Sequence, residues 1–177
     1  MNVKLIKPTI EYKDLIIDML DEWSEFNRTH VTDKSPSAIF KDYSNFDVYL
    51  ENIKLAETVC PPNRVTASLF FALDLDRNII VGATQIRHYL NEKLLNSGGH
   101  IGDGVRPSER RKGYATEIIR LALIECKKMG IDKVLMACHP DNIGSKKSII
   151  NNGGVYWRTV MDDDEQLEQY WIDITGK

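Results

Sequence analysis

The stretch Gly104-Val105-Arg106-Pro107-Ser108-Glu109-Arg110-Arg111-Lys112-Gly113-Tyr114-Ala115-Thr116 decides how the rest of the chain is interpreted. A short run typical of a strand ends at Val105, a loop with four basic side chains follows, and Gly113 opens a long amphipathic helix. The first N–H groups of a helix lack intrahelical partners, and the aligned peptide dipoles add roughly half a positive charge there. Because glycine has no Cβ, a phosphate can approach its backbone closely. This order of features therefore predicts an anion site.

Two other phosphate-binding loops do not match this stretch. A P-loop has Gly-Lys-Ser/Thr after a first glycine and four residues, whereas Lys112 precedes Gly113 here. A dinucleotide-binding turn has the pattern G-x-G-x-x-G, which begins at Gly102 and Gly104 but has Pro107 in place of the third glycine. Neither kind of nucleotide site is predicted.

Length and composition are those of an ordinary globular domain, and one domain is expected over residues 1–177. The chain is 42% hydrophobic and 28% charged, and its net charge of −3 at pH 7 does not favour nucleic-acid binding. A basic loop within an acidic protein suits a small polyanionic cofactor better than a long phosphate backbone.

The remaining compositional features indicate a reducing compartment. Cys60, Cys126 and Cys138 form neither a disulfide framework nor a metal-binding CxxC spacing, so reduced thiols are expected. No apolar signal segment or membrane-length run is present, and a cytoplasmic protein without membrane partners is predicted. The acidic run 161–165 is interpreted as a solvated turn, so no metal is predicted.

Hydrophobic periodicity predicts a mixture of helices and strands. Helices are predicted over 9–26, 46–59, 113–129 and 142–151, with one helical turn within 89–99. Strands are predicted over 3–6, 65–73, 79–88, 100–105, 132–138, 155–160 and 167–174. The helix between strands 100–105 and 132–138 implies that these two strands are parallel neighbours. Gly102 and Gly104 predict a bulge or a close approach of another backbone.

Two motifs carry a family resemblance. The run Arg110-Arg111-Lys112-Gly113-Tyr114-Ala115 resembles the Q/R-x-x-G-x-G/A motif of the GNAT superfamily of N-acetyltransferases. The run from Asn142 to Gly154 resembles the other signature of that family, N-x-x-S/A followed by G-F/G. The resemblance covers nearly the whole chain and is strongest to small bacterial members. It implies an α/β (α+β) fold: a mixed, mostly antiparallel sheet with a central splayed parallel strand pair, flanked by helices.

The resemblance also implies a site for acetyl-coenzyme A. In the family the first motif wraps the pyrophosphate, here Arg110, Arg111, Lys112, Gly113, Tyr114, Ala115 and Thr116. The pantetheine arm threads between two diverging strands, with backbone groups of Val105 on one side and Asn142 and Ser145 on the other. Without the resemblance, Asn142 and Ser145 are equally well interpreted as helix-cap residues.

The implied reaction is acetyl transfer from acetyl-coenzyme A to a primary amine of a small molecule or a protein, by direct attack in a ternary complex. The amine must first lose a proton, and Asp103 is the first candidate for the base, with His100 and His139 as alternatives. The family often has a tyrosine seven residues after the motif asparagine as the acid. Ile149 occupies that position here.

Other functions stay open at this level. Ile149 motivates a non-catalytic coenzyme A binding or sensor module, and the basic loop motivates an RNA-associated protein, which the acidic total disfavours. The acceptor pocket is expected to draw on residues 23–59, the region of Tyr89, and Trp157 or Tyr170. The acidic excess mildly favours a cationic acceptor. A homodimer through the edge of the last hairpin is compatible with the pattern.

Overall fold

The computed structural model describes residues 1–30 and 35–176. The elements follow one another as β1 (Val3–Ile6), a 3-10 turn η1 (Ile10–Tyr12), α1 (Lys13–Thr29), η2 (Ser37–Phe40), α2 (Phe46–Leu55), β2 (Ala67–Asp74), β3 (Ile79–Arg87), α3 (Glu92–Leu95), β4 (Ile101–Val105), η3 (Pro107–Glu109), α4 (Tyr114–Lys128), β5 (Lys133–Cys138), α5 (Ile143–Asn151), β6 (Val155–Asp162) and β7 (Glu165–Asp173).

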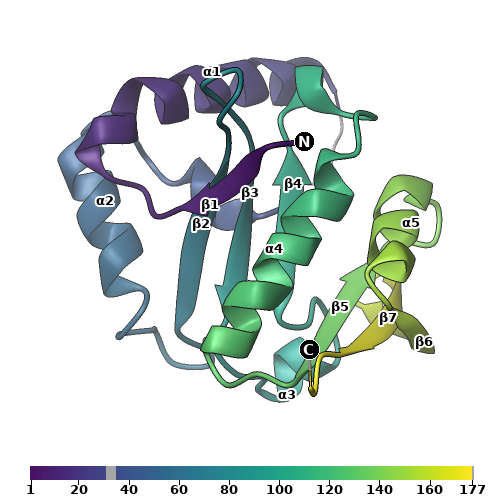
Figure 1. Cartoon of the computed structure of the whole chain (residues 1–177). Helices are drawn as coiled ribbons and strands as arrows, with labels where there is room; N and C mark the ends of the chain where they lie inside the picture. The colour runs from purple at the N-terminus through teal and green to yellow at the C-terminus, as the bar shows by residue number, and fades with distance from the viewer. Residues whose placement is uncertain (31–34, 177) are drawn as a thin grey trace.

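These strands form two antiparallel sheets. The larger sheet has the strand order β1-β2-β3-β4, and the smaller has the order β5-β7-β6. Figure 1 shows α4 in front of the larger sheet, with the smaller sheet and α5 beside β4. The mixed α/β class with antiparallel sheets and flanking helices confirms the predicted fold class.

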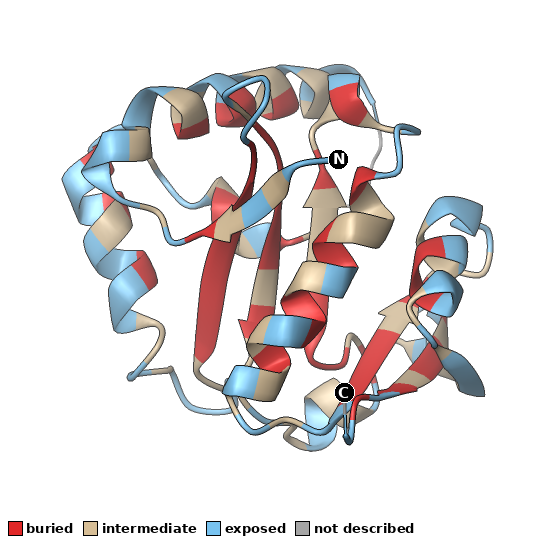
Figure 2. Ribbon diagram, viewed as in Figure 1, coloured by how far each residue is buried: buried red, intermediate tan, exposed pale blue. Residues whose placement is uncertain are grey.

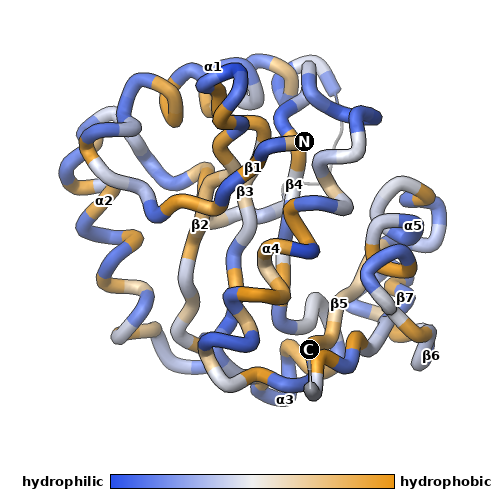
Figure 3. The backbone as a smooth tube through the Cα atoms, in the orientation of Figure 1, coloured by the Kyte–Doolittle hydropathy of each residue, from blue (hydrophilic) through white to orange (hydrophobic). Residues whose placement is uncertain are grey.

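Helices cover both faces of the larger sheet. On one face, α1 and α2 bury Trp23 and Tyr49 against the strands, and on the other face α4 buries Ile118 and Ile119. Figure 2 shows the resulting buried layer along the central strands, and Figure 3 shows hydrophobic and hydrophilic residues alternating around the turns of α4. Burying a large aliphatic side chain contributes about 1.5–3 kcal/mol, so these faces fix how the helices dock.

Most predicted elements form within a few residues of their expected bounds. The helix predicted from Thr9 differs at its start, because a 3-10 turn precedes α1 and the Thr9 side chain makes no capping hydrogen bond. The second helix, predicted to Val59, ends at Leu55. The single helical turn expected within 89–99 is α3.

The prediction that β4 and β5 are parallel neighbours is wrong as regards their pairing, because the two strands do not hydrogen-bond along their length. Within the described ranges, the two strands share no ladder and are joined only just before β4 begins, by an antiparallel bridge between Gly99 and Met136. The neighbouring His100 strengthens this junction: its N–H donates to the Leu135 carbonyl at 2.7 Å, and its Nδ1 accepts the Leu135 N–H at 3.0 Å. The strands therefore diverge from a single corner.

Of the two expectations for the glycines of β4, close approach is confirmed. The register between β3 and β4 runs without a shift from Gly82–Val105 to Ile86–Ile101, so β4 has no bulge. A Cβ on Gly104 would lie 2.2 Å from the Ser35 carbonyl oxygen and 2.7 Å from Cη2 of Trp23. The approaching groups belong to residues 23 and 35, on the face opposite α4.

This packing gives the first testable prediction. Gly104→Ala should lower the free energy of unfolding by about 2 kcal/mol or more, because the new methyl group overlaps the Ser35 carbonyl. Denaturant unfolding followed by tryptophan fluorescence measures the change. Gly144→Ala is the matched control, since a Cβ there meets nothing nearer than Asn142 Oδ1 at 3.8 Å. Equal stability of the two variants would contradict the close approach.

Candidate active site

The backbone between β4 and α4 presents a row of unsatisfied donors. Within the described parts of the chain, no acceptor pairs with the N–H groups of residues 111–116. Arg111 has φ +62° and Gly113 has φ +89°, and such alternation of backbone conformation turns successive N–H groups toward one concavity. The start of α4 adds its partial positive charge. This geometry fits a diphosphate.

Gly113 is required here by its conformation. A Cβ built on this residue would meet only the Met1 Cε, at 3.5 Å, so the space beside it is open. At φ +89°, however, side chains other than hydrogen are strained. Arg111 is exposed beside it, and its side chain makes no hydrogen bond or ion pair with the described residues. It is therefore the side chain of this loop best placed to meet an anion.

A partly buried network of hydrogen bonds fixes the loop to the turn between β2 and β3. Arg77 forms two hydrogen bonds with Glu109, at 2.7 and 2.9 Å, and a third with the Tyr114 hydroxyl at 3.2 Å. That hydroxyl donates to Asp74 at 2.6 Å. Lys112 adds a 3.0 Å bond to Glu109. The hydrogen bonds from Arg77 hold the pKa of Glu109 at about 2, with a smaller contribution from Lys112.

A second set of contacts fixes the loop to α1. Arg106 pairs with Glu22 and, at 2.8 Å, with Asp18, while Glu22 also accepts the Ser108 N–H at 2.9 Å. The hydrogen bonds from Ser108 and Arg106 outweigh the effect of burial and lower the pKa of Glu22. The N-terminal end of η3 is therefore capped by a side chain from a distant helix.

These networks leave most of the basic side chains of the loop engaged with protein groups. The guanidinium of Arg110 lies 4.8 Å from the Phe26 ring centroid, and its Nε donates to the Val105 carbonyl at 3.3 Å. Lys112 pairs with Glu109, and the side chain of Tyr114 is buried. For Arg110, Lys112 and Tyr114, the side chains are therefore committed to the protein, and the backbone is the part available to a phosphate.

The edge of β4 that faces β5 carries free backbone groups. The Arg106 N–H donates to the carbonyl of Val81 on β3. Because successive N–H groups of a strand point to opposite sides, the N–H of Val105 points toward the gap between the two sheets. The Val105 carbonyl already accepts Arg110 Nε, which leaves the N–H as the donor on this edge. The same alternation places the side chain of Asp103 on the face covered by α4, with Ile101 and Val105.

The opposite wall of the gap is the start of α5. Asn142 Oδ1 accepts the Ser145 N–H at 3.1 Å, so the helix-cap interpretation of this pair is confirmed. The amide nitrogen of Asn142 makes no hydrogen bond with the described residues and remains available. Farther along, the Thr116 hydroxyl bonds Ser148 at 3.2 Å, which ties α5 to α4 and commits the Thr116 side chain to packing.

A cluster of titratable groups at the end of β5 was not predicted from the sequence. Glu168 accepts Lys146 Nζ at 2.7 Å and the Tyr170 hydroxyl at 2.5 Å, and it lies opposite Cys138 on the neighbouring strand. Burial, reinforced by Glu168, raises the pKa of the Cys138 thiol to about 11. Asp103 also lies near enough to act on this thiol. The register of β5 on β7 places Cys138 opposite Glu168, a pairing that depends on tertiary structure.

The alternative bases have structural roles or lie apart. Burial and the nearby Arg87 lower the pKa of His100 to about 4, and its Nδ1 accepts a backbone N–H, so it is a neutral link between the sheets. His139 Nε2 lies 3.7 Å from Glu165 on the exposed turn of the last hairpin. Ile149 is fully buried and packs against Gly154. Asp103 stays the first candidate.

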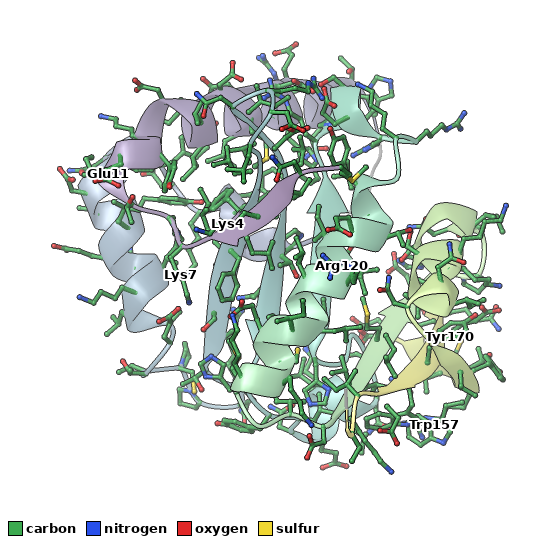
Figure 4. The ribbon with its side chains drawn as sticks, viewed as in Figure 1. Lys4, Lys7, Glu11, Arg120, Trp157 and Tyr170 are labelled. Carbon is green, nitrogen blue, oxygen red and sulfur yellow. The ribbon has the colours of Figure 1, made fainter. Side chains whose placement is uncertain are left out.

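The aromatic residues expected near an acceptor lie on opposite faces of the smaller sheet. Tyr170 is buried in the core shared with α4, whereas Trp157 packs on Trp171, with ring centroids 5.6 Å apart. Figure 4 shows both residues on the hairpin strands, and Arg120 on α4. Arg120 borders a cavity of about 790 Å³ between the outer side of α4 and the end of α5, away from the β4–β5 gap.

Comparison with known families decides what this arrangement is. A family model described as an acetyltransferase (GNAT) domain matches residues 14–155, which is well over half of the chain. The chain belongs to the GNAT acetyltransferase family. It is accordingly an acyl-CoA-dependent acetyltransferase, as the two motifs predicted. No curated protein matches the sequence, and no described helix is long and apolar enough to cross a membrane.

Solved structures share the fold of this GNAT domain at low sequence identity. The ribosomal L7/L12 alpha-N-protein acetyltransferase RimL in complex with coenzyme A superposes with a TM-score of 0.69 at 11% identity, over 100% of this chain and 97% of that one. Ribosomal-protein-S5-alanine acetyltransferase from Vibrio fischeri gives 0.67 at 17% identity, over 98% and 93%. The microcin C7 self-immunity acetyltransferase MccE, bound to acetyl-CoA and AMP, gives 0.65 at 16%, over 98% and 93%.

The backbone of the loop gives the second prediction. Gly113→Ala should weaken binding of coenzyme A by at least about tenfold, because relief of strain at positive φ turns the N–H groups away from their common concavity. Isothermal titration calorimetry measures the affinity. Gly130→Ala is the matched control, since Gly130 has φ +77°, open surroundings and a place at the far end of α4. If both variants bind as the wild type does, the loop does not hold the cofactor.

The third prediction concerns acid stability. Because Glu109 has a lower pKa folded than unfolded, its contribution is present above about pH 4.3 and is lost as pH falls toward 2. Glu109→Gln should therefore be less stable than the wild type by about 1–3 kcal/mol at pH 6, and the difference should narrow by pH 3. Urea unfolding at each pH measures it. Glu125→Gln, an exposed pair on α4, should change stability by under about 0.5 kcal/mol, and a pH-independent difference for Glu109→Gln would contradict the network.

Proposed function

We propose that this GNAT protein transfers the acetyl group of acetyl-CoA to a primary amine of a small molecule or a protein, by direct attack while both substrates are bound. The observation that carries the proposal is the row of unpaired N–H groups at residues 111–116, set beside a gap between two diverging strands. Together they offer a diphosphate site and a passage for a linear arm.

The roles of the cofactor residues follow from their geometry. The backbone from Arg111 to Thr116, with the Arg111 side chain, holds the pyrophosphate. The Val105 N–H and the Asn142 amide face the pantetheine arm from the two sides of the gap, and Ser145 leaves room beside it. Arg110, Lys112 and Tyr114 act by fixing the loop, through Phe26, Glu109 and Asp74 respectively. The acetyl-CoA supplies the activated thioester.

Proton transfer is assigned to the groups nearest the gap. Asp103 is half-buried on β4 and lies near the end of β5, where a carboxylate can accept the proton of the attacking amine directly or through water. Ile149 carries no proton to give to the departing thiolate. The thiolate therefore takes its proton from solvent.

The acceptor is a small-molecule or protein amine. Structural neighbours are described as acting on ribosomal proteins L7/L12 and S5, and another confers immunity to microcin C7. These descriptions support both acceptor types equally. One acetyltransferase domain over residues 1–177, a cytoplasmic location that suits three free cysteines, and a homodimer through the edge strand β6 stay predictions.

A non-catalytic coenzyme A sensor is the second candidate, and Ile149 at the usual tyrosine position is the observation that favours it. Thiol release from acetyl-CoA, measured over a broad panel of amines, separates the two. Tight coenzyme A binding with no release over the whole panel would support the sensor and contradict acetyl transfer.

The fourth prediction tests the base. Asp103→Asn should lower kcat by about a hundredfold or more at neutral pH while the KM for acetyl-CoA stays within about twofold, because the amide cannot accept the proton of the amine. Asp47→Asn, an exposed change on α2, is the matched control and should keep full activity. An unchanged kcat in Asp103→Asn would remove this residue as the base while leaving the acetyl transfer standing.

A further inference from the structure

Arg87 lies near the β4–β5 corner, and no acid among the described residues forms an ion pair with it. It ends β3, is half-buried, and its Nη1 donates to the carbonyls of Gly99 at 2.9 Å and Gly98 at 3.5 Å. Over the ranges that the structure describes, no carboxylate lies within ion-pair distance of its guanidinium. Burial lowers the pKa of Arg87, and no neighbouring acid raises it.

The other terminal nitrogen of this guanidinium, Nη2, lies close to Gly102, together with other polar groups. The Arg87 Nη2 lies 3.7 Å, and the Ser35 Oγ 3.2 Å, from the point that a Cβ on Gly102 would occupy. Gln85 is paired with Gly102 across the strands, so its side chain shares this face. The Gln85 amide makes no hydrogen bond with the described residues. Among the described residues, Arg87 Nη2 and the Gln85 amide are therefore donors without acceptors beside a position that has no side chain.

A further unpaired donor lies on the same face. Trp23 Nε1 is buried and has no hydrogen-bond partner in the described chain, and the edge of the Trp23 ring packs against Gly104. Gly102 and Gly104 are two residues apart, about 6–7 Å along the strand. A buried donor without an acceptor costs about 1–3 kcal/mol, so this face is suited to a ligand rich in acceptor oxygens.

A second arginine gives the neighbouring sheet the same sign of charge. Arg158 on β6 bonds the Leu95 carbonyl at 3.0 Å, Asn96 at 2.9 Å and Gln169 at 2.9 Å, which are all neutral groups. Like Arg87, it has no acidic partner among the described residues. Arg87 and Arg158 are therefore two guanidinium groups that no ion pair neutralises among the described residues.

We infer that Arg87 anchors an anionic oxygen group, a carboxylate or a phosphate, carried by the amine that accepts the acetyl group. Gln85 and Ser35 assist from either side of Gly102. This inference rests on the proposed acetyl transfer and names the class of its acceptor. It reverses the expectation of a cationic acceptor, which the overall charge suggested. A purely structural Arg87 would need only Nη1, which holds the Gly98 and Gly99 carbonyls, and would leave Nη2 without a function.

The placement suits one small acceptor or one chain end. Nη2 lies beside Gly102, whose sequence neighbour Asp103 has its side chain on the opposite face of β4, so the amine of an acceptor held by Arg87 passes its proton to Asp103 around the strand edge through water. An arginine fork that binds an oxyanion in two hydrogen bonds also fixes its orientation. Arg87 is therefore a specificity residue and takes no part in proton transfer.

The experiment compares matched amines with and without the anionic group. Acetylation of L-leucine is measured against L-leucinol, and of O-phosphoethanolamine against ethanolamine, with wild type, Arg87→Gln, Arg87→Lys and the exposed control Arg64→Gln. The wild type should prefer the anionic member of at least one pair by about tenfold or more in kcat/KM. Arg87→Gln should bring that ratio near one, Arg87→Lys should keep part of it, and Arg64→Gln should keep all of it.

The two pairs separate a carboxylate from a phosphate as the natural group. The inference is overturned if the wild type shows no preference in either pair, or if Arg87→Gln keeps the preference while the neutral amines react as before. Arg87→Lys keeps the charge, so it serves as the folded variant should Arg87→Gln unfold. In that case an undiminished ratio in Arg87→Lys, which lacks the two-pronged geometry, counts against the inference.

A binding measurement decides the inference even without turnover. N-acetyl-L-leucine and N-acetyl-L-leucinamide are titrated into the wild type, and the arginine Nε–H signals are followed by NMR, with the Arg87 signal assigned by its loss in Arg87→Lys. The signal should shift with the carboxylate and not with the amide. No acetylation of any amine would contradict the proposed function, whereas no shift with the carboxylate, together with no shift when O-phosphoethanolamine is titrated in the same way, would contradict the anionic anchor alone.

Discussion

The ion pair between the partly exposed Arg77 and the buried Glu109 is the interaction on which the proposed anion site depends. The loop from Arg106 to Gly113 has little regular structure of its own, and residues 111–116 leave their N–H groups unpaired. Such a backbone keeps one shape only if its side chains are held elsewhere. Glu109 and Tyr114 hold it from the β2–β3 turn, and Arg106 holds it from α1. Contacts with residues outside the loop thus stabilise a backbone that is strained and has unpaired N–H groups.

These contacts give most of the basic residues in the motif a structural role. A run of arginines and lysine suggests direct charge attraction for phosphate, yet three of the four basic side chains face protein groups. In the proposed function, the site would recognise an anion mainly through backbone dipoles that are fixed before the ligand arrives. Fixed dipoles require little reorganisation on binding, which is the advantage of preorganisation over mobile charge.

Sequence patterns predicted the elements and the order of the motifs well, because both depend on local periodicity and on short spacings. The glycines of β4 correctly predicted a close approach. The sequence could not identify Ser35 and Trp23 as the approaching residues, because that depends on tertiary packing. The sequence could not predict the pairing of Cys138 with Glu168, or that Arg87 has no ion pair among the described residues, for the same reason. The prediction of a parallel ladder between β4 and β5 was wrong because a ladder requires strands that stay adjacent, whereas these two meet at one end only.

The single corner between the two sheets has a mechanical consequence. A continuous ladder resists shear along its whole length, whereas the backbones of β4 and β5 are hydrogen-bonded to each other, within the described residues, only around Gly99, His100 and Leu135. A pantetheine arm lying in the gap, as proposed above, would add bonds between the two strands at their open end. Hydrogen exchange along β4 and β5 should therefore be slower when the gap is filled.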